Sequence, residues 1–139
     1  MMRRRHSGKQ RGIALLEVMI ALVILGIGLL GAIGMQARAY SALLDAGLRA
    51  EATLACDKLI GAMSTDPANV ANYALAEGAT PNNTIGPWVR ETTAAIPGAI
   101  ISVVITPQTH RNQVDISIRW TRKAGAAEIR QQLTAYIGS

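Results

Sequence analysis

The sequence contains no phenylalanine, and its aromatic residues are two tryptophans and three tyrosines among 139 residues. Half of all residues are nevertheless hydrophobic. The apolar mass therefore consists mostly of small aliphatic side chains, which favours a membrane segment over a large soluble core. A chain of this length that places one segment in a membrane has room for a single modest soluble domain.

Cysteine is nearly absent as well. Cys56 is the single cysteine, so no disulfide within the chain can stabilise a soluble domain. We expect Cys56 to act as a small apolar residue of a helix. The alternatives are an intermolecular disulfide and a redox-active thiol.

Histidine is also scarce, and beyond the N-terminal segment only His110 remains, within a polar stretch. Neither a metal cluster nor a histidine-based triad can be assembled from such a set. No glycine-rich phosphate loop lies between a strand and a helix. We expect no enzyme, no cofactor, no metal and no small-molecule substrate. His110 is expected to be an exposed turn residue rather than a ligand-binding one.

Acidic residues are missing from the first twelve positions, which carry five basic residues: Arg3, Arg4, Arg5, Lys9 and Arg11. Beyond Gly12 the basic and acidic residues are equal in number, so the net charge of +5 belongs to this N-terminal segment. The remainder of the chain has no electrostatic support for nucleic-acid binding. A basic cluster beside an apolar segment indicates instead that the cluster stays in the cytoplasm.

The apolar segment comprises residues 13–35, in which Glu17 is the one ionisable side chain. As a helix it is about 34 Å long, enough to cross a bilayer. No small-residue cleavage site follows it, as a secretory signal would require. The sequence predicts a retained transmembrane helix over residues 13–35, a cytoplasmic leader over residues 1–12, and a periplasmic domain after the membrane.

Glu17 is costly within hydrocarbon unless a cation neutralises it, and intramembrane acids are functional candidates for that reason. If the chain were cut after Gly12, the new α-amine of Ile13 would lie one helical turn away. That amine could pair with Glu17 in the same subunit or in a neighbouring one. The alternative is a glutamate at the headgroup boundary.

The run Arg11-Gly12-Ile13-Ala14-Leu15-Leu16-Glu17-Val18, between a basic leader and an apolar helix, resembles the type IV prepilin signature. The resemblance implies that a prepilin peptidase cuts between Gly12 and Ile13 and methylates the new amine of Ile13. It also implies that Glu17 is the subunit-assembly carboxylate, which neutralises the N-terminal amine of an adjoining subunit. Ile13 and Ala14 stand where Phe and Thr are commonest.

Within the superfamily, residues 29–36 and 54–59, followed by Met63 and Pro67, resemble the minor pilins called type IV pilus modification protein PilV. The resemblance implies a role in initiating and assembling the type IV pilus, and so in twitching motility and adhesion. The implied partners are other minor pilins, the major pilin, the prepilin peptidase and the inner membrane. The alternatives are a minor pseudopilin of type II secretion and, from another class, a single-span periplasmic binding protein.

Four glycines occupy the apolar segment: Gly26, Gly28, Gly31 and Gly34. Glycine lowers helix stability and lets neighbouring helices approach closely, so these positions are candidates for helix packing. The alternative is the ordinary glycine enrichment of membrane helices.

The rest of the chain predicts an α+β fold of pilin type. The helix should continue over residues 36–64 and place one apolar side on a small antiparallel sheet: Leu44, Leu48, Ala52, Ala55, Leu59 and Met63. Residues 65–139 should form a connecting loop with one short helix, then strands at 99–106, 114–121 and around 129–137.

Several finer expectations concern this domain. Residues 88–93 could add an edge strand, and alternation places Trp120 in the core rather than on a cationic surface. Gly125 suits the turn before the last strand. Arg111, Arg122 and Lys123 are expected to be solvated turn charges.

Overall fold

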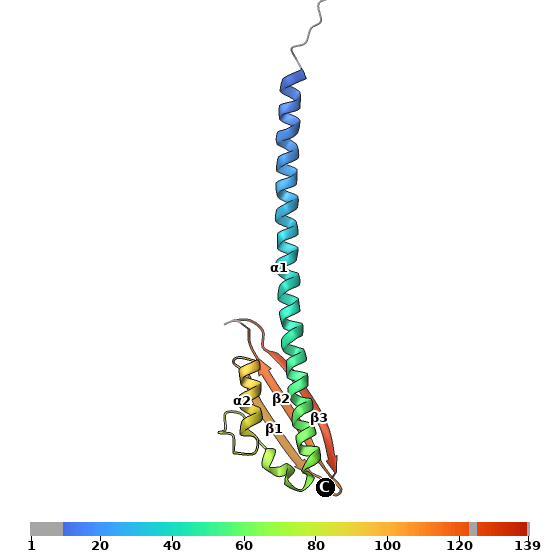
Figure 1. Ribbon diagram of the computed structural model, residues 1–139, viewed down its shortest axis with the longest axis vertical. Helices are drawn as coiled ribbons and strands as arrows, with labels where there is room; N and C mark the ends of the chain where they lie inside the picture. The colour runs from blue at the N-terminus through green and yellow to red at the C-terminus, as the bar shows by residue number, and fades with distance from the viewer. Residues whose placement is uncertain (1–9, 123–124, 139) are drawn as a thin grey trace, which may run out of the picture. The chain divides into compact units, whose positions relative to one another are not determined.

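The computed structural model describes residues 10–122 and 125–138, and the side chains from Ile13 onward. Residues 1–9 of the predicted basic leader and the predicted turn charge Lys123 lie outside the described residues. The chain divides into two compact units, which meet between Leu44 and Asp45. Helix α1 (Gln10–Thr65) contributes to both units (Figure 1). We call the second unit, residues 45–139, the head unit.

In the first unit the described chain is entirely helical. Its large hydrophobic side chains are exposed all along the helix, for example Ile13 at 69% and Leu30 at 72%. The helix is long and apolar enough to cross a membrane, and no part of its most hydrophobic window is buried inside the molecule. Such a surface requires an apolar environment supplied from outside the chain.

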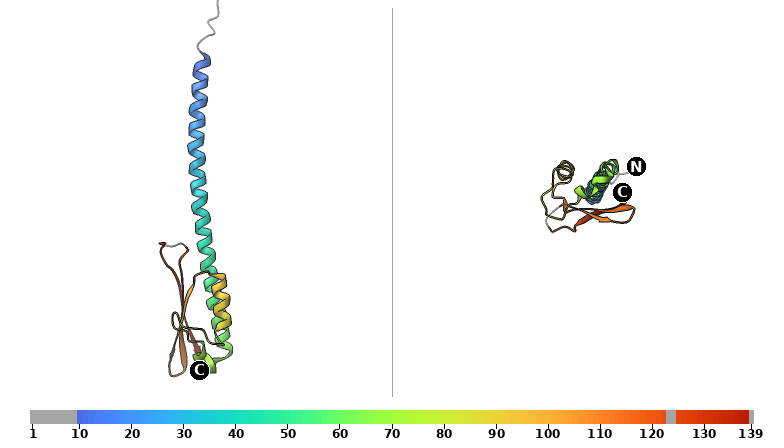
Figure 2. Two further views of the ribbon diagram at one scale, coloured as in Figure 1. Left: turned by 90° about the vertical axis from the view of Figure 1, so that its left-hand side faces the viewer. Right: turned by 90° about the horizontal axis from the view of Figure 1, so that it is seen from below.

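The head unit is a three-stranded antiparallel sheet with strand order β1-β2-β3, against which α1 packs (Figures 1 and 2). The strands are β1 (Ile100–Pro107), β2 (Arg111–Trp120) and β3 (Ile129–Gly138). Their pairing is antiparallel and continuous from end to end. The predicted α+β fold, with a long N-terminal helix and a small antiparallel sheet, is confirmed.

Alternation along β2 produces the core. Four side chains of this strand are buried and face α1: Val114, Ile116, Ile118 and Trp120. Their intervening neighbours are only partly buried, as a sheet with one covered face requires. Trp120 is 2% exposed, so the prediction that it belongs to the core is confirmed.

Helix α1 meets the sheet through what we call the core-facing stripe: Leu48, Ala52, Ala55, Leu59 and Met63. Ala52 and Met63 are fully buried, whereas Leu48 is partly buried at the edge of the core. Leu44, predicted to share this stripe, is instead 51% exposed. The prediction was wrong there because the side chains packed against the core begin at Leu48.

The connection between α1 and the sheet contains a 3-10 helix, η1 (Pro67–Tyr73), and a second α-helix, α2 (Gly86–Ala95). The prediction of an edge strand at residues 88–93 was wrong, because these residues form α2. Asn82 closes the turn that precedes α2: its side-chain oxygen accepts the N–H of Thr84 and of Ile85, and Gly86 N–H donates to its carbonyl at 2.8 Å.

Helix α2 contains two adjacent β-branched residues, which favour strands over helices. Thr92 and Thr93 have low helix propensity, but each hydroxyl donates to the carbonyl four residues earlier, on Trp88 and Val89 respectively. Packing of Ile96 and Thr92 in the core then outweighs the local preference.

The turns bear out part of the expectation. Gly125 has a φ of +82°, a conformation that favours glycine, in the predicted turn before β3. Arg111 and Arg122 are exposed as expected, but each has a partner that the sequence did not indicate. Arg111 stacks over the ring of Tyr136 at 4.4 Å, and Arg122 Nε lies 2.8 Å from Asp45 Oδ1.

We predict that Leu59→Ala lowers the free energy of unfolding of the head unit by about 2–5 kcal/mol, because Leu59 is 1% exposed and its loss leaves a cavity. Leu54→Ala, on the same helix at 48% exposure, should cost less than about 1 kcal/mol. Denaturant unfolding of the full chain in micelles, followed by tryptophan fluorescence, measures both. Equal losses in the two variants would contradict the position of the core.

Candidate processing and assembly site

The residues singled out near the N-terminus lie on the first turns of α1. Ile13 and Glu17 are four residues apart in this helix, so their side chains lie on the same face. Both are exposed. A cut after Gly12 would make Ile13 the first residue of the helix, with its α-amine at the helix N-terminus. The geometry therefore leaves Glu17 available to a cation from its own chain or from a neighbour.

The four glycines of the apolar segment also lie in α1. A Cβ built at Gly26, Gly28, Gly31 or Gly34 would meet no atom within 4 Å. Nothing within the described chain therefore requires glycine there. Any packing constraint on these positions must come from another molecule.

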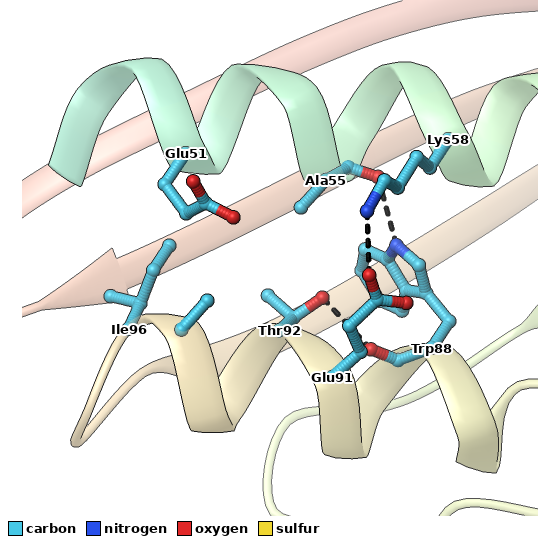
Figure 3. Close-up of a pocket in the computed structure, with 8 residues that line it drawn as sticks. Glu51, Ala55, Lys58, Trp88, Glu91, Thr92 and Ile96 are labelled. Atoms are coloured by element: carbon cyan, nitrogen blue, oxygen red, sulfur yellow. Dashed lines mark hydrogen bonds and ion pairs between the residues drawn. The ribbon is translucent and has the colours of Figure 1, made fainter. Parts of the chain in front are cut away.

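Helix α2 is attached to α1 by polar contacts that sequence reasoning missed (Figure 3). Trp88 Nε1 donates to the Ala55 carbonyl at 2.8 Å, and Lys58 Nζ lies 2.5 Å from Glu91 Oε1. The hydrogen bond with Glu91 and the charge of that carboxylate raise the pKa of Lys58. No signal in the sequence links residues 33 positions apart in this way.

The space between the two helices is too small for a metabolite. Its volume is about 10 Å³, and it is lined by Glu51, Ala55, Trp88 and their neighbours (Figure 3). That volume accommodates about one water molecule. The contacts between α1 and α2 serve packing rather than ligand binding.

A second polar network joins two connections to the sheet. Arg119, on β2, forms ion pairs with Glu77 and with Glu128, the latter at 3.2 Å. Its side chain is only 18% exposed. The network holds the loop after η1 and the start of β3 against the middle strand.

Cys56 is fully buried in α1, in contact with the core. Desolvation, with a smaller contribution from the charge of Asp57, raises the pKa of its thiol to about 11. A thiol that stays protonated is a poor nucleophile and a poor redox group. The prediction that Cys56 acts as a small apolar helix residue is confirmed.

His110 lies in the turn between β1 and β2 and is exposed. The hollow beside it is lined only by the turn itself, Gln108 to Arg111. Among residues 10–122 and 125–138, no group of three or more His, Cys, Asp or Glu side chains could hold a metal ion.

Residues 7–33 match the family model described as the prokaryotic N-terminal methylation motif. No curated protein and no solved structure matches the chain. The match covers the predicted cleavage site, Glu17 and most of the apolar segment, and it supports the resemblance to the type IV pilin superfamily. With the α+β head unit, it supports a pilin-like or pseudopilin-like structural protein that a single helix anchors in a membrane.

We predict that stability falls between pH 8 and pH 11. The pKa of Cys56 is about 11 in the folded state, whereas an unperturbed cysteine has a pKa of 9.0, so the unfolded chain loses its thiol proton first as the pH rises. Deprotonation then favours the unfolded state, by up to about 2 kcal/mol.

Cys56→Ala should remove this part of the pH dependence while leaving the part due to lysine titration. Denaturant unfolding at pH 8 and pH 10.5 in both proteins measures it. Identical pH slopes in the two proteins would show that Cys56 is not buried as described.

Proposed function

We propose that this protein is a minor type IV pilin, similar to PilV, which takes part in initiating and assembling the pilus and thereby supports twitching motility and adhesion. The observation that carries the proposal is the N-terminal methylation motif at residues 7–33, followed directly by an exposed apolar helix. The motif implies processing by a prepilin peptidase and assembly with other pilins.

In the proposed pathway, residues 1–12 form a cytoplasmic leader, residues 13–35 span the inner membrane, and residues 36–64 continue the helix into the periplasm. Residues 65–139 complete the periplasmic domain. The peptidase cuts between Gly12 and Ile13 and methylates the α-amine of Ile13. The basic leader, beside an apolar span, supports this orientation.

Glu17 has the assembly role in this proposal. A lone carboxylate in hydrocarbon costs several kcal/mol, so a subunit gains by placing Glu17 beside a cation. The α-amine of a neighbouring subunit, freed by the peptidase, is such a cation at the same end of the helix. Pairing the two fixes the axial offset between subunits, because a shift of one helical turn would separate the charges by about 5 Å.

The exposed side chains of the first unit provide the remaining association energy. Lipid covers these side chains before assembly, and neighbouring helices cover them afterwards. Both environments are apolar, so the difference in free energy must come from closer packing between helices than between helix and lipid. Gly26, Gly28, Gly31 and Gly34 leave open positions on the helix surface where a neighbouring backbone can approach. We assign them to helix packing on that basis.

The same motif would serve a minor pseudopilin of type II secretion, which is our alternative within the class. A single-span periplasmic binding protein would need neither the cleavage motif nor Glu17. The motif match therefore favours the pilin classes over it.

We predict that the protein isolated from its native membrane begins at Ile13, with the mass of one added methyl group. In a strain without the prepilin peptidase, and in a Gly12→Leu variant, it should retain its leader. Intact-mass measurement and N-terminal sequencing decide the matter. A native chain that begins at Met1 or Met2 would exclude the proposed function.

We predict that Glu17→Gln is cleaved normally but is incorporated into pili at least about tenfold less than the native chain, because an unpaired amine then remains in the membrane. Glu51→Gln removes an acid from the same helix outside the apolar segment and serves as the control. Quantitative immunoblots of sheared pili measure incorporation. Normal incorporation of Glu17→Gln would remove the assembly role from this carboxylate.

A further inference from the structure

Strand β3 is an edge strand with an unpaired side. Val103 on β1 exchanges both backbone hydrogen bonds with Leu75, at 2.9 and 2.8 Å, so the odd-numbered residues of β1 face away from β2. The register carries this alternation across the sheet: Val103 pairs with Ile116, and Ile116 pairs with Leu133. Leu133 and the other odd-numbered residues of β3 therefore bond to β2.

The even-numbered residues of β3 direct their backbone N–H and C=O groups away from the sheet: Arg130, Gln132, Thr134, Tyr136 and Gly138. No backbone partner for them lies within the part of the chain that the structure describes. Only an extended backbone carries donors and acceptors at the matching spacing of about 6.8 Å along a strand. The chemistry of this edge thus specifies a β-strand as its partner.

The two edges of the sheet differ in how they are protected. Leu75 covers β1 at Val103, and β1 ends at Pro107. β3 has no such protection among the described residues: no backbone covers its free side, and it contains no proline. Its register with β2 is one to one, so it has no bulge either. Its single charged residue is Arg130. Proteins usually protect a long free edge, because it invites pairing with other chains.

We propose that the free edge of β3 pairs with an edge strand of a different pilin-like subunit and so extends the sheet across a subunit interface. This inference rests on the proposed function, which places both subunits in one membrane. It adds a specific contact surface on the head unit to the contacts of the apolar helices.

A second copy of this chain does not fit the edge. Twofold antiparallel pairing of β3 with β3 would reverse the direction of the head unit in the second copy, and with it the part of α1 from Asp45 onward, which lies along the sheet (Figures 1 and 2). The two chains would then enter their head units, at Asp45, from opposite ends of the paired sheet, which does not suit two subunits anchored side by side in one membrane. A copy related by translation would present β1, which Leu75 closes at Val103.

The charge and exposure of the β3 side chains indicate which residues the opposing strand should carry. Arg130 is exposed, and β3 carries no acid, so the opposing strand should supply one. Tyr136 is 54% exposed near the other end of the strand, with Arg111 stacked on its ring. Aromatic residues held in this way are common anchors of interfaces.

The test uses the full chain in its native cells, with a photo-crosslinking residue at position 132 or, as a control, at position 90 on α2. We expect position 132 to crosslink to a strand of another prepilin-class subunit, with the crosslinked peptide identified by mass spectrometry. Position 90 should give no crosslink to that strand. Gln132→Pro and Gln132→Ala are compared with the crosslinker moved to position 134, which is also exposed on β3 and leaves Arg130 in place.

Gln132→Pro removes only an outward N–H, and it should reduce the crosslink yield at least about tenfold relative to Gln132→Ala. Arg130→Glu, which leaves the backbone intact, should reduce the yield from position 132 similarly, whereas Arg90→Glu should not. Native thermal unfolding of each variant confirms that the head unit is folded.

Equal yields in Gln132→Pro and Gln132→Ala, or crosslinks from position 132 only to lipid or to a second copy, would overturn the proposal. If the chain is still cleaved at Ile13 and enters pili in those experiments, the proposed function survives. A chain that is never cleaved would reject the proposed function instead.

Discussion

The packing of the second half of α1 on the inner face of the sheet is the contact on which the head unit depends. The chain has one cysteine, and that thiol is buried in this same contact, so covalent crosslinks contribute nothing within the chain. Ala52, Leu59 and Met63 bury nearly all of their surface, and a small sheet gains much of its stability from packing of this kind against a helix. Helix α2 contacts α1 in the same region, through the bond from Trp88 to the Ala55 carbonyl.

The two units differ in how the apolar surface of α1 is covered. In the head unit, one side of the helix is apolar and a sheet covers it. In the most hydrophobic window of the first unit the helix is apolar all round, and no part of that window is buried by the described chain. A helix that is apolar on every side is stable only in lipid or among other helices. One part of the chain therefore forms a folded domain by itself, and the other part needs lipid or other helices around it.

The sequence predicted those features that depend on periodicity. Alternation at Val114, Ile116 and Ile118 identified β2 and its buried face, and the spacing of Ala52, Leu59 and Met63 identified the core side of α1. It failed where tertiary contacts decide. Trp88 and Thr92 have a local preference for strands, but a hydrogen bond to Ala55 and burial beside Ile96 favour a helix. The partners of Arg119 and Lys58 could not be predicted either, because pairs of distant charges leave no pattern in the chain. The motif around Gly12 and Glu17 was recognisable because it is a local string of residues.

The bond from Trp88 to the Ala55 carbonyl has a mechanical consequence. Most side chains that contact a helix do so through dispersion, which has no preferred direction and so does not by itself fix the position of one helix along another. A directed bond to a main-chain carbonyl, reinforced three residues later by Lys58 and Glu91, fixes α2 to one position along the axis of α1. Tension applied along α1 would therefore act in shear on these contacts between α1 and α2. In shear they must break together, whereas a force perpendicular to the helices would break them one after another. Unwinding that begins at the N-terminal end of the helix would reach the buried Ala52 first and the bonded carbonyl of Ala55 next.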